Sequence, residues 1–262
     1  MSAIITSIYN CPVKSISFQN IDKCKINKNI GIEGDRVFAF SQNLDFDQSK
    51  EFEKNPEARK GKWNKIVTLK NTPVFNKYNF LYKNNKLTLT IKDKEIITIN
   101  VNDSNERDNL VKKLIELEGS LKNDIRLMKN DEHPFYDTSI SNKSMFRNSI
   151  SLLNINSIKD FENKIDQRIE KSIFRGNLYF DGIEAWEERN WIGKTIKIND
   201  VLFKVEKNIP RCVAINLKPE TDDNSFNLLK TLKETYDHYD MGVYLTPEND
   251  GEINLSEKIL IK

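Results

Sequence analysis

One cysteine of this chain stands in a setting that suits chemistry. Cys212 follows Ile209-Pro210-Arg211, directly after a predicted strand. The proline stiffens the approach, and the arginine places a permanent positive charge beside the thiol. A neighbouring cation favours the thiolate, which is the form of cysteine that binds soft metals or attacks an electrophile. The alternative is a purely structural role, because cysteine is among the residue types most often buried in a core.

Short motifs surround this cysteine in a defined order along the C-terminal half. They read Phe174-Arg175-Gly176-Asn177, Trp191-Ile192-Gly193-Lys194-Thr195-Ile196, Pro210-Arg211-Cys212, Pro219-Glu220-Thr221, Leu228-Leu229-Lys230-Thr231-Leu232 and Met241-Gly242-Val243-Tyr244. This ordered set resembles the MOSC domain, the module named after the C-terminal part of molybdenum cofactor sulfurase. Six motifs in the same order make a much stronger signal than any one of them.

The N-terminal half adds two further motifs. The segment from Tyr9 to Ser15 (YNCPVKS) resembles the YPVKS entry of the β-barrel domain that precedes the MOSC domain in one branch of the family. Gly34-Asp35-Arg36 resembles the GDR motif of that domain. This branch is similar to the mitochondrial amidoxime reducing component and its bacterial relatives. The resemblance implies a molybdenum cofactor of the molybdopterin form between the two halves, with the thiolate of Cys212 as a ligand of molybdenum.

The same resemblance implies a set of cofactor-binding residues. Molybdopterin carries a phosphate and a polar pterin, so its site needs basic side chains and hydrogen-bond donors arranged around an anion. Cys212 would supply the soft ligand that molybdenum accepts. For each cation taken alone, the alternative is a solvated surface charge. The residues at the matching motif positions are Lys14, Ser15, Arg36, Arg175, Asn177 and Arg211.

Some positions near Cys212 differ from the family pattern. Ile209 stands where a second cysteine is common in this branch, and Ile215-Asn216 stands where small hydroxylated residues are common. Lys218 precedes Pro219 where relatives often have an aspartate. A lysine in place of an aspartate changes the charge expected beside the site.

Composition excludes several other classes of protein. The chain has 262 residues, and its 41 Lys and Arg against 39 Asp and Glu give a net charge of +2, which indicates no nucleic-acid partner. Three cysteines and two histidines without zinc-ligand spacing exclude a zinc finger and a four-thiolate [2Fe–2S] centre. No run approaches the roughly 18 apolar residues of a membrane span. The N-terminus does not resemble a signal peptide, so we expect a cytoplasmic protein.

Strands dominate the elements that must position these residues. Apolar alternation predicts strands near residues 3–9, 18–26, 36–41, 177–180, 195–198, 201–205 and 241–246, and a hairpin over 87–101. Helices are expected over 103–119, from a capping box at Ser157-Ile158-Lys159-Asp160, and near 225–235. We interpret residues 42–64 as a long surface loop and Glu187-Glu188 as part of an exposed turn.

The order of these elements predicts the fold class. Because strands do not alternate regularly with helices, we expect a mainly β (α+β), barrel-rich fold rather than a doubly wound sheet. The resemblance divides the chain into an N-terminal MOSC-type β-barrel domain over residues 1–120 and a MOSC domain over residues 121–262, with a few peripheral helices.

The resemblance implies a molybdenum-dependent oxidoreductase that reduces small N-hydroxylated substrates. Three cysteines and the lack of a nucleotide-binding glycine motif indicate that electrons come from a separate iron–sulfur protein or flavin reductase. One alternative is a sulfur carrier in which Cys212 holds a persulfide. Another is a module that binds the cofactor without turnover.

Overall fold

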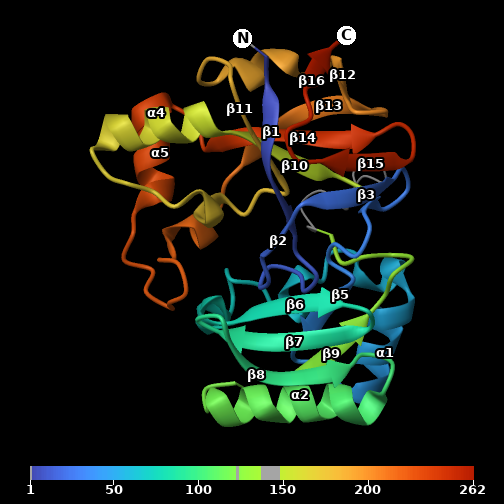
Figure 1. Cartoon of the computed structure of the whole chain (residues 1–262). Helices are drawn as coiled ribbons and strands as arrows, with labels where there is room; N and C mark the ends of the chain where they lie inside the picture. Colours follow the sequence, from blue (N-terminus) through green and yellow to red (C-terminus); the bar gives the residue numbers. More distant parts are fainter. Residues whose placement is uncertain (1, 122–123, 137–147) are drawn as a thin grey trace.

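The computed structural model describes residues 2–121, 124–136 and 148–262, and its core is a large sheet that curls through the upper part of Figure 1. A three-stranded sheet lies next to it. The predicted mainly β fold is confirmed. The order of strands in the large sheet is β16 (Ile259–Ile261), β12 (Thr195–Ile198), β13 (Val201–Pro210), β14 (Asp240–Pro247), β10 (Ile150–Asn154), β11 (Leu178–Asp181), β1 (Ile4–Asn10) and β2 (Gln19–Ile21). The small sheet has the order β15 (Gly251–Asn254), β3 (Lys23–Asn27) and β4 (Gly31–Ile32).

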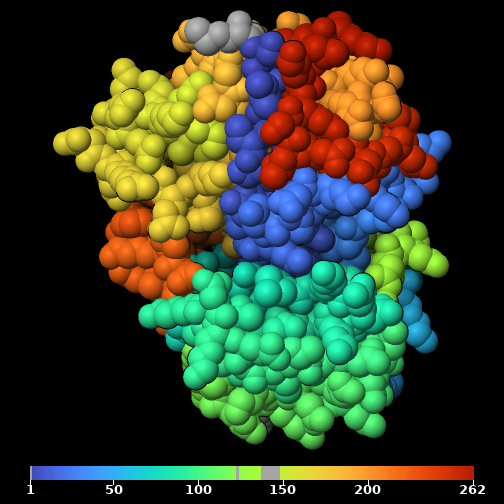
Figure 2. All heavy atoms as spheres, in the orientation of Figure 1, coloured from blue at the N-terminus to red at the C-terminus, as the bar shows by residue number. Residues whose placement is uncertain are grey.

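The first strands of the chain belong to the sheets of the C-terminal half. β1 pairs antiparallel with β11, and β3 pairs antiparallel with β15. In Figure 2 the blue N-terminal residues accordingly lie beside the red C-terminal residues. The apolar side chains of β1, such as Ile5 and Ile8, are buried in the same core as Val201, Phe203 and Val205 of β13. The division of the chain near residue 120 stays a prediction, and this strand pairing crosses it.

Two smaller sheets form the lower part of the molecule in Figure 1. One pairs β5 (Phe38–Ser41) with β9 (Arg126–Lys129), and the other has the order β6 (Asn79–Lys83), β7 (Lys86–Ile91) and β8 (Lys94–Asn100). The antiparallel pairing of β7 with β8 confirms the predicted hairpin. Alternate residues of β7, Leu87 and Leu89, are buried in the core beneath the sheet, as a half-buried strand requires.

The helices lie at the periphery, as expected. α2 (Ser104–Leu117) begins at the N-cap Asp103, whose side chain accepts hydrogen bonds from the next turn, and buries Leu110 and Leu114. α4 (Ile155–Ile165) connects β10 to its parallel neighbour β11. α5 (Leu228–Tyr236) confirms the helix predicted near 225–235. Within the three described ranges, no helix is long and apolar enough to cross a membrane.

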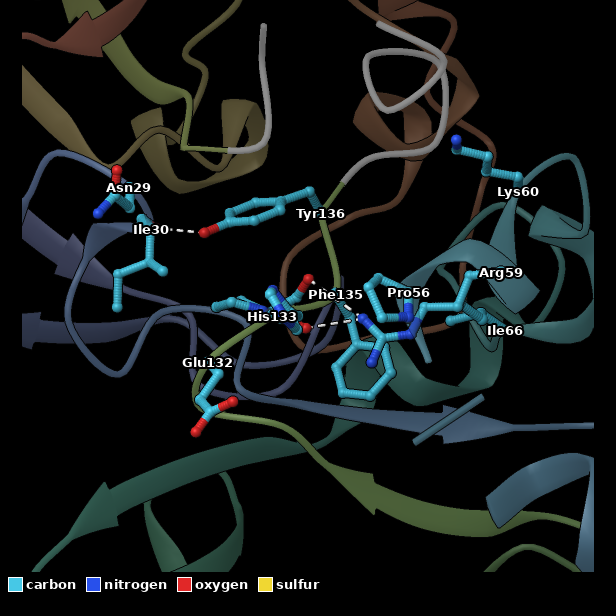
Figure 3. A pocket seen from close by; sticks show the side chains of 11 residues that line it. Asn29, Ile30, Pro56, Arg59, Lys60, Ile66, Glu132, His133, Phe135 and Tyr136 are labelled. Atoms are coloured by element: carbon cyan, nitrogen blue, oxygen red, sulfur yellow. Dashed lines mark hydrogen bonds between the residues drawn. The ribbon is translucent and has the colours of Figure 1, made fainter. Parts of the chain in front are cut away.

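The interpretation of residues 42–64 as a loop was wrong. This segment contains α1 (Phe46–Lys54), which begins with a capping box between Asp45 and Gln48. The helix is strongly polar and buries Ser49 and Phe52, of which only Phe52 is apolar, so the hydrophobic periodicity gave little signal. Tertiary contacts hold the segment instead. The buried Arg59 donates to the carbonyl oxygens of Phe52 and His133 and lies 3.9 Å from the ring centre of Phe135 (Figure 3).

A second correction concerns the start of α4 and the acidic pair Glu187-Glu188. α4 begins two residues before Ser157, with Asn154 as its N-cap, so the predicted capping box does not form. Ser157 instead donates to the carboxylate of Glu188 at 2.8 Å, and Asn154 donates to the same carboxylate at 3.1 Å. Glu188 is fully buried in the short helix η6 (Glu187–Trp191) rather than exposed on a turn. Burial raises the pKa of Glu188, and the two donors partly offset this effect.

We expect Glu188→Ala to destabilise the protein by about 1–3 kcal/mol, because buried donors on Ser157 and Asn154 would lose their acceptor. The adjacent substitution Glu187→Ala is the matched control, since Glu187 is only partly buried and contacts the exposed Asn190. Urea unfolding of both variants measures the difference. Equal unfolding midpoints in the two variants would contradict the structural role given to Glu188.

Candidate functional site

A cavity of about 620 Å³ is lined by residues from both halves of the chain. Its walls come from the loop after β1, the loop before β5, the segment 61–70, the turn before β11 and the end of β13. Six of the seven predicted site residues line it. They are Lys14, Ser15, Arg36, Arg175, Arg211 and Cys212.

The charge on the cavity wall is of one sign. Its described lining residues include five cations and no Asp or Glu. Four of these cations were predicted from the sequence, and Lys70 is the fifth. Because like charges this close repel one another, the arrangement favours a bound anion over an empty cavity. The described residues therefore form a site that fits an anionic ligand.

One buried carboxylate lies behind this wall. Asp35 accepts a hydrogen bond of 2.7 Å from the backbone N–H of Cys11 and forms an ion pair with Arg36. Asn177, the seventh predicted residue, donates to the same carboxylate at 3.3 Å. Burial raises the pKa of Asp35, whereas Arg36 and the Cys11 N–H lower it. Asp35 thus joins the loops after β1 and before β5 to the turn before β11.

Asn177 supports the site from behind rather than lining it. The side-chain oxygen of Asn177 accepts from the hydroxyl of Ser151 on β10 at 2.9 Å, and its amide reaches Asp35. The backbone N–H of Asn177 in turn donates to the Ser151 hydroxyl at 2.8 Å. This paired contact fixes the turn that follows Arg175. Asn177 therefore positions the site.

Three lining residues adopt the left-handed backbone conformation that favours glycine. Their φ angles are 64° at Ser15, 55° at Arg36 and 50° at Arg175. Such a conformation costs about 1–2 kcal/mol for an ordinary residue, so the surrounding contacts must hold it. The N–H of Arg36 donates to the carbonyl of Cys11 at 2.7 Å, and the N–H of Arg175 donates to that of Ser172 at 2.9 Å. Strained backbone thus coincides with the predicted binding residues.

Backbone carbonyls accept hydrogen bonds from three of the cations. Lys14 Nζ donates to the carbonyl of Tyr136 at 2.8 Å, and Arg175 donates to that of Ser17 at 2.8 Å. Arg211 donates to the carbonyl of Phe174 at 2.7 Å. Burial lowers the pKa of both Arg175 and Arg211. Neutral acceptors orient the side chains of Arg175 and Arg211 without cancelling their charge, which favours a positive potential in the cavity.

Cys212 is the exposed thiol of the cavity. It lies at the end of β13, where it precedes the short helix η7 (Val213–Asn216). The other two cysteines, Cys11 and Cys24, are buried. In the part of the chain that the structure describes, no three His, Cys, Asp or Glu side chains gather as a metal-ligand set. Cys212 is thus the one thiol here that is open to a ligand or a reagent at the cavity mouth.

Sequence reasoning missed several residues of the site. Asp35 was noted only as part of a motif, and nothing in the pattern around Trp63 and Lys70 indicated that they line the cavity. Lys218, whose charge was expected beside the site, is not a lining residue and instead forms an ion pair with Asp223. Only the tertiary arrangement reveals these placements.

Part of the sequence matches a known protein family. Residues 136–259, in the C-terminal half of this chain, match the family model described as the MOSC domain. The resemblance inferred from the ordered motifs is confirmed. A relative in rat (Rattus norvegicus), mitochondrial amidoxime reducing component 2, is 32% identical over 72 residues. That match covers 28% of this chain and 21% of the relative, so the chain matches about a fifth of the relative's length.

Solved structures were also compared with this chain. The YuaD protein from Bacillus subtilis is 11% identical, with a TM-score of 0.45, and the match covers 100% of this chain and 96% of that protein. YiiM from Geobacillus stearothermophilus is 15% identical, with a TM-score of 0.35, over 43% of this chain and 53% of that protein.

The exposure of the three thiols predicts their reactivity. Burial raises the pKa of Cys11 to about 11 and that of Cys24 to about 12, so both stay protonated and shielded at neutral pH. We expect iodoacetamide at pH 8 to modify Cys212 in the native protein within minutes and to leave Cys11 and Cys24 unmodified. Mass spectrometry of tryptic peptides measures the occupancy at each position. Unfolding in urea is the control and should make all three thiols react; fast native labelling of Cys11 would refute the placement given above.

Proposed function

We propose that the protein is an oxidoreductase that binds a molybdenum cofactor of the molybdopterin form in this cavity and reduces small N-hydroxylated compounds. The observation that carries the proposal is that four cations, which are buried or half-buried, and one exposed thiol surround a single cavity whose described lining has no carboxylate. The cations would pair with an anionic cofactor, and the thiolate of Cys212 is a soft ligand that suits the metal of that cofactor. The rat relative is named for amidoxime reduction, which supports the choice of N-hydroxylated substrates.

Each residue has a distinct part in this proposal. Lys14, Arg36, Arg175 and Arg211 bind the anionic groups of the cofactor, and Ser15 adds a hydroxyl partner. Cys212 holds the metal and tunes its potential through the donor strength of the sulfur. Asp35 and Asn177 keep Arg36 and the loop around Cys11 in place. When bound, the cofactor supplies two-electron redox chemistry at a metal centre that accepts an oxygen atom.

The apolar part of the wall controls water. Ile66, Leu69 and Ile215 line the cavity and are each almost completely buried. Apolar surface around a redox site lowers the local dielectric constant and strengthens the electrostatic contacts made by the cations. The protein's contribution is therefore to bind, orient and exclude solvent. Electrons would come from a separate iron–sulfur protein or flavin reductase.

A sulfur-carrier role is the second candidate function. The observation in its favour is the exposure of Cys212, since a persulfide must be reached by its acceptor. The cations that line the cavity have no part in that role, which is why we place the sulfur-carrier role second. Purified protein from a cofactor-competent host separates the two candidates. Molybdenum near one atom per chain with bound pterin supports the oxidoreductase, and labile sulfur without molybdenum supports the carrier.

Removing one of the cations that line the cavity should weaken binding of the cofactor. Loss of one charge-assisted hydrogen bond to an anion costs about 1.5–3 kcal/mol, so Arg175→Ala and Lys14→Ala should each lower cofactor affinity roughly ten- to a hundredfold. Their effects should couple if both side chains contact the same group. Pterin fluorescence after oxidation measures occupancy. Arg168→Ala is the matched control, because Arg168 is exposed. Full occupancy in both cavity variants would show that the anion binds elsewhere.

The thiol itself can be tested by an isosteric change. Cys212→Ser should abolish the reduction of benzamidoxime by reduced viologen, because a serine hydroxyl is a poor ligand for this metal. The fold should remain intact, since Cys212 is exposed and its side chain caps no helix. Cys24→Ser is the control and should retain activity. Activity of Cys212→Ser equal to that of the unchanged protein would refute the assignment of the ligand.

A further inference from the structure

The mouth of the cavity carries an aromatic side chain and a cation that the proposed cofactor site does not use. Trp63 and Lys70 both line the cavity, and both are exposed, whereas the other four lining cations are buried or half-buried. Lys70 Nζ lies 5.3 Å from the centre of the Trp63 ring. Cys212, which also lines the cavity, is exposed as well and belongs to the other half of the chain. The exposed tryptophan and lysine therefore stand at the entrance through which a small molecule would approach Cys212.

The charge around Lys70 favours binding of a negatively charged ligand. The sequence has no Asp or Glu between Glu57 and Asp93, so no carboxylate close to Lys70 in the sequence competes for this lysine. No described residue on the cavity wall is acidic either. An anionic group at the entrance would meet an attractive potential throughout.

The exposed ring adds a shape preference. Trp63 is 49% exposed, which is unusual for so large an apolar side chain and leaves its surface available to a ligand. An indole offers a flat, polarisable face on which another aromatic ring can stack. A single ligand can use both features if it carries an aromatic ring with an acidic substituent.

We propose that Trp63 and Lys70 form a substrate-selecting site for flat aromatic molecules that carry a carboxylate. The ring of the substrate stacks on Trp63, and its carboxylate pairs with Lys70. Its reducible N–O group then lies on the side of the cavity that holds Cys212. The claim about which substrates react rests on the proposed function. The claim about which molecules bind rests only on the residues at the mouth of the cavity.

The test compares benzamidoxime with 4-carboxybenzamidoxime in the cofactor-loaded protein, with reduced viologen as the electron donor. An exposed ion pair contributes up to about 1 kcal/mol, so kcat/KM should be about three- to fivefold higher for the carboxylate. Lys70→Gln should bring the ratio to about one. Trp63→Leu should lower kcat/KM for both compounds by roughly two- to tenfold. Lys62→Gln, the same change in the same exposed segment but outside the cavity, should keep the original ratio.

A binding measurement separates this inference from the proposed reaction. Isothermal titration calorimetry with 4-carboxybenzamidoxime should show a Kd that rises about three- to fivefold in Lys70→Gln and is unchanged in Lys62→Gln. If that pattern appears without molybdenum or turnover, the proposed reaction fails and the selecting site stands. If Lys70→Gln leaves both the Kd and the substrate ratio unchanged, the inference is overturned. It is equally overturned if Lys70→Gln slows turnover only with a protein electron donor, because the surface would then be a protein-docking face.

Discussion

Mutual repulsion among cations is the constraint on which this structure depends. Five positive side chains line one cavity whose described wall has no acidic residue, and one buried carboxylate, Asp35, lies behind it. Placing several charges close together in a medium of low dielectric constant is costly unless hydrogen bonds and counter-charges offset it. The protein meets this cost with the Asp35–Arg36 pair and with backbone carbonyls that accept from Lys14, Arg175 and Arg211. The anionic cofactor proposed above would offset the remaining excess of positive charge.

The topology of the chain brings the residues that line the cavity together. Lys14 and Arg36 come from loops around the first strands, whereas Arg175 and Cys212 come from loops of the large sheet. Pairing of β1 with β11 holds the two sets of loops against each other. Ser15, Arg36 and Arg175 have a strained, left-handed backbone conformation at the place where the ligand would bind. Strand pairing across the chain thus supplies the rigidity that the strained loops require.

Short-range patterns were reliable where one face of an element is buried. The α2 helix and the β7–β8 hairpin were predicted because their apolar residues repeat with the period of the element. The α1 helix was missed because one buried aromatic ring, Phe52, gives no period, and its position depends on Arg59 and Phe135. The capping box at Ser157 failed for a related reason. Its hydroxyl donates a hydrogen bond to the carboxylate of Glu188, which is distant in the sequence, and a four-residue motif carries no information about that partner.

The sequence by itself determined which residue types occur in which order, and that was sufficient to identify the MOSC domain and to nominate Cys212 with its cations. Only the tertiary structure decided which of these residues share a wall. It placed six of the seven nominated residues around the cavity, put Asn177 behind it, excluded Lys218 and added Trp63 and Lys70. The physical reason is the range of the interactions. Capping and periodicity act within a few residues, whereas the contact between Asn177 and Asp35 joins side chains 142 positions apart, and that proximity exists only after the sheets have closed.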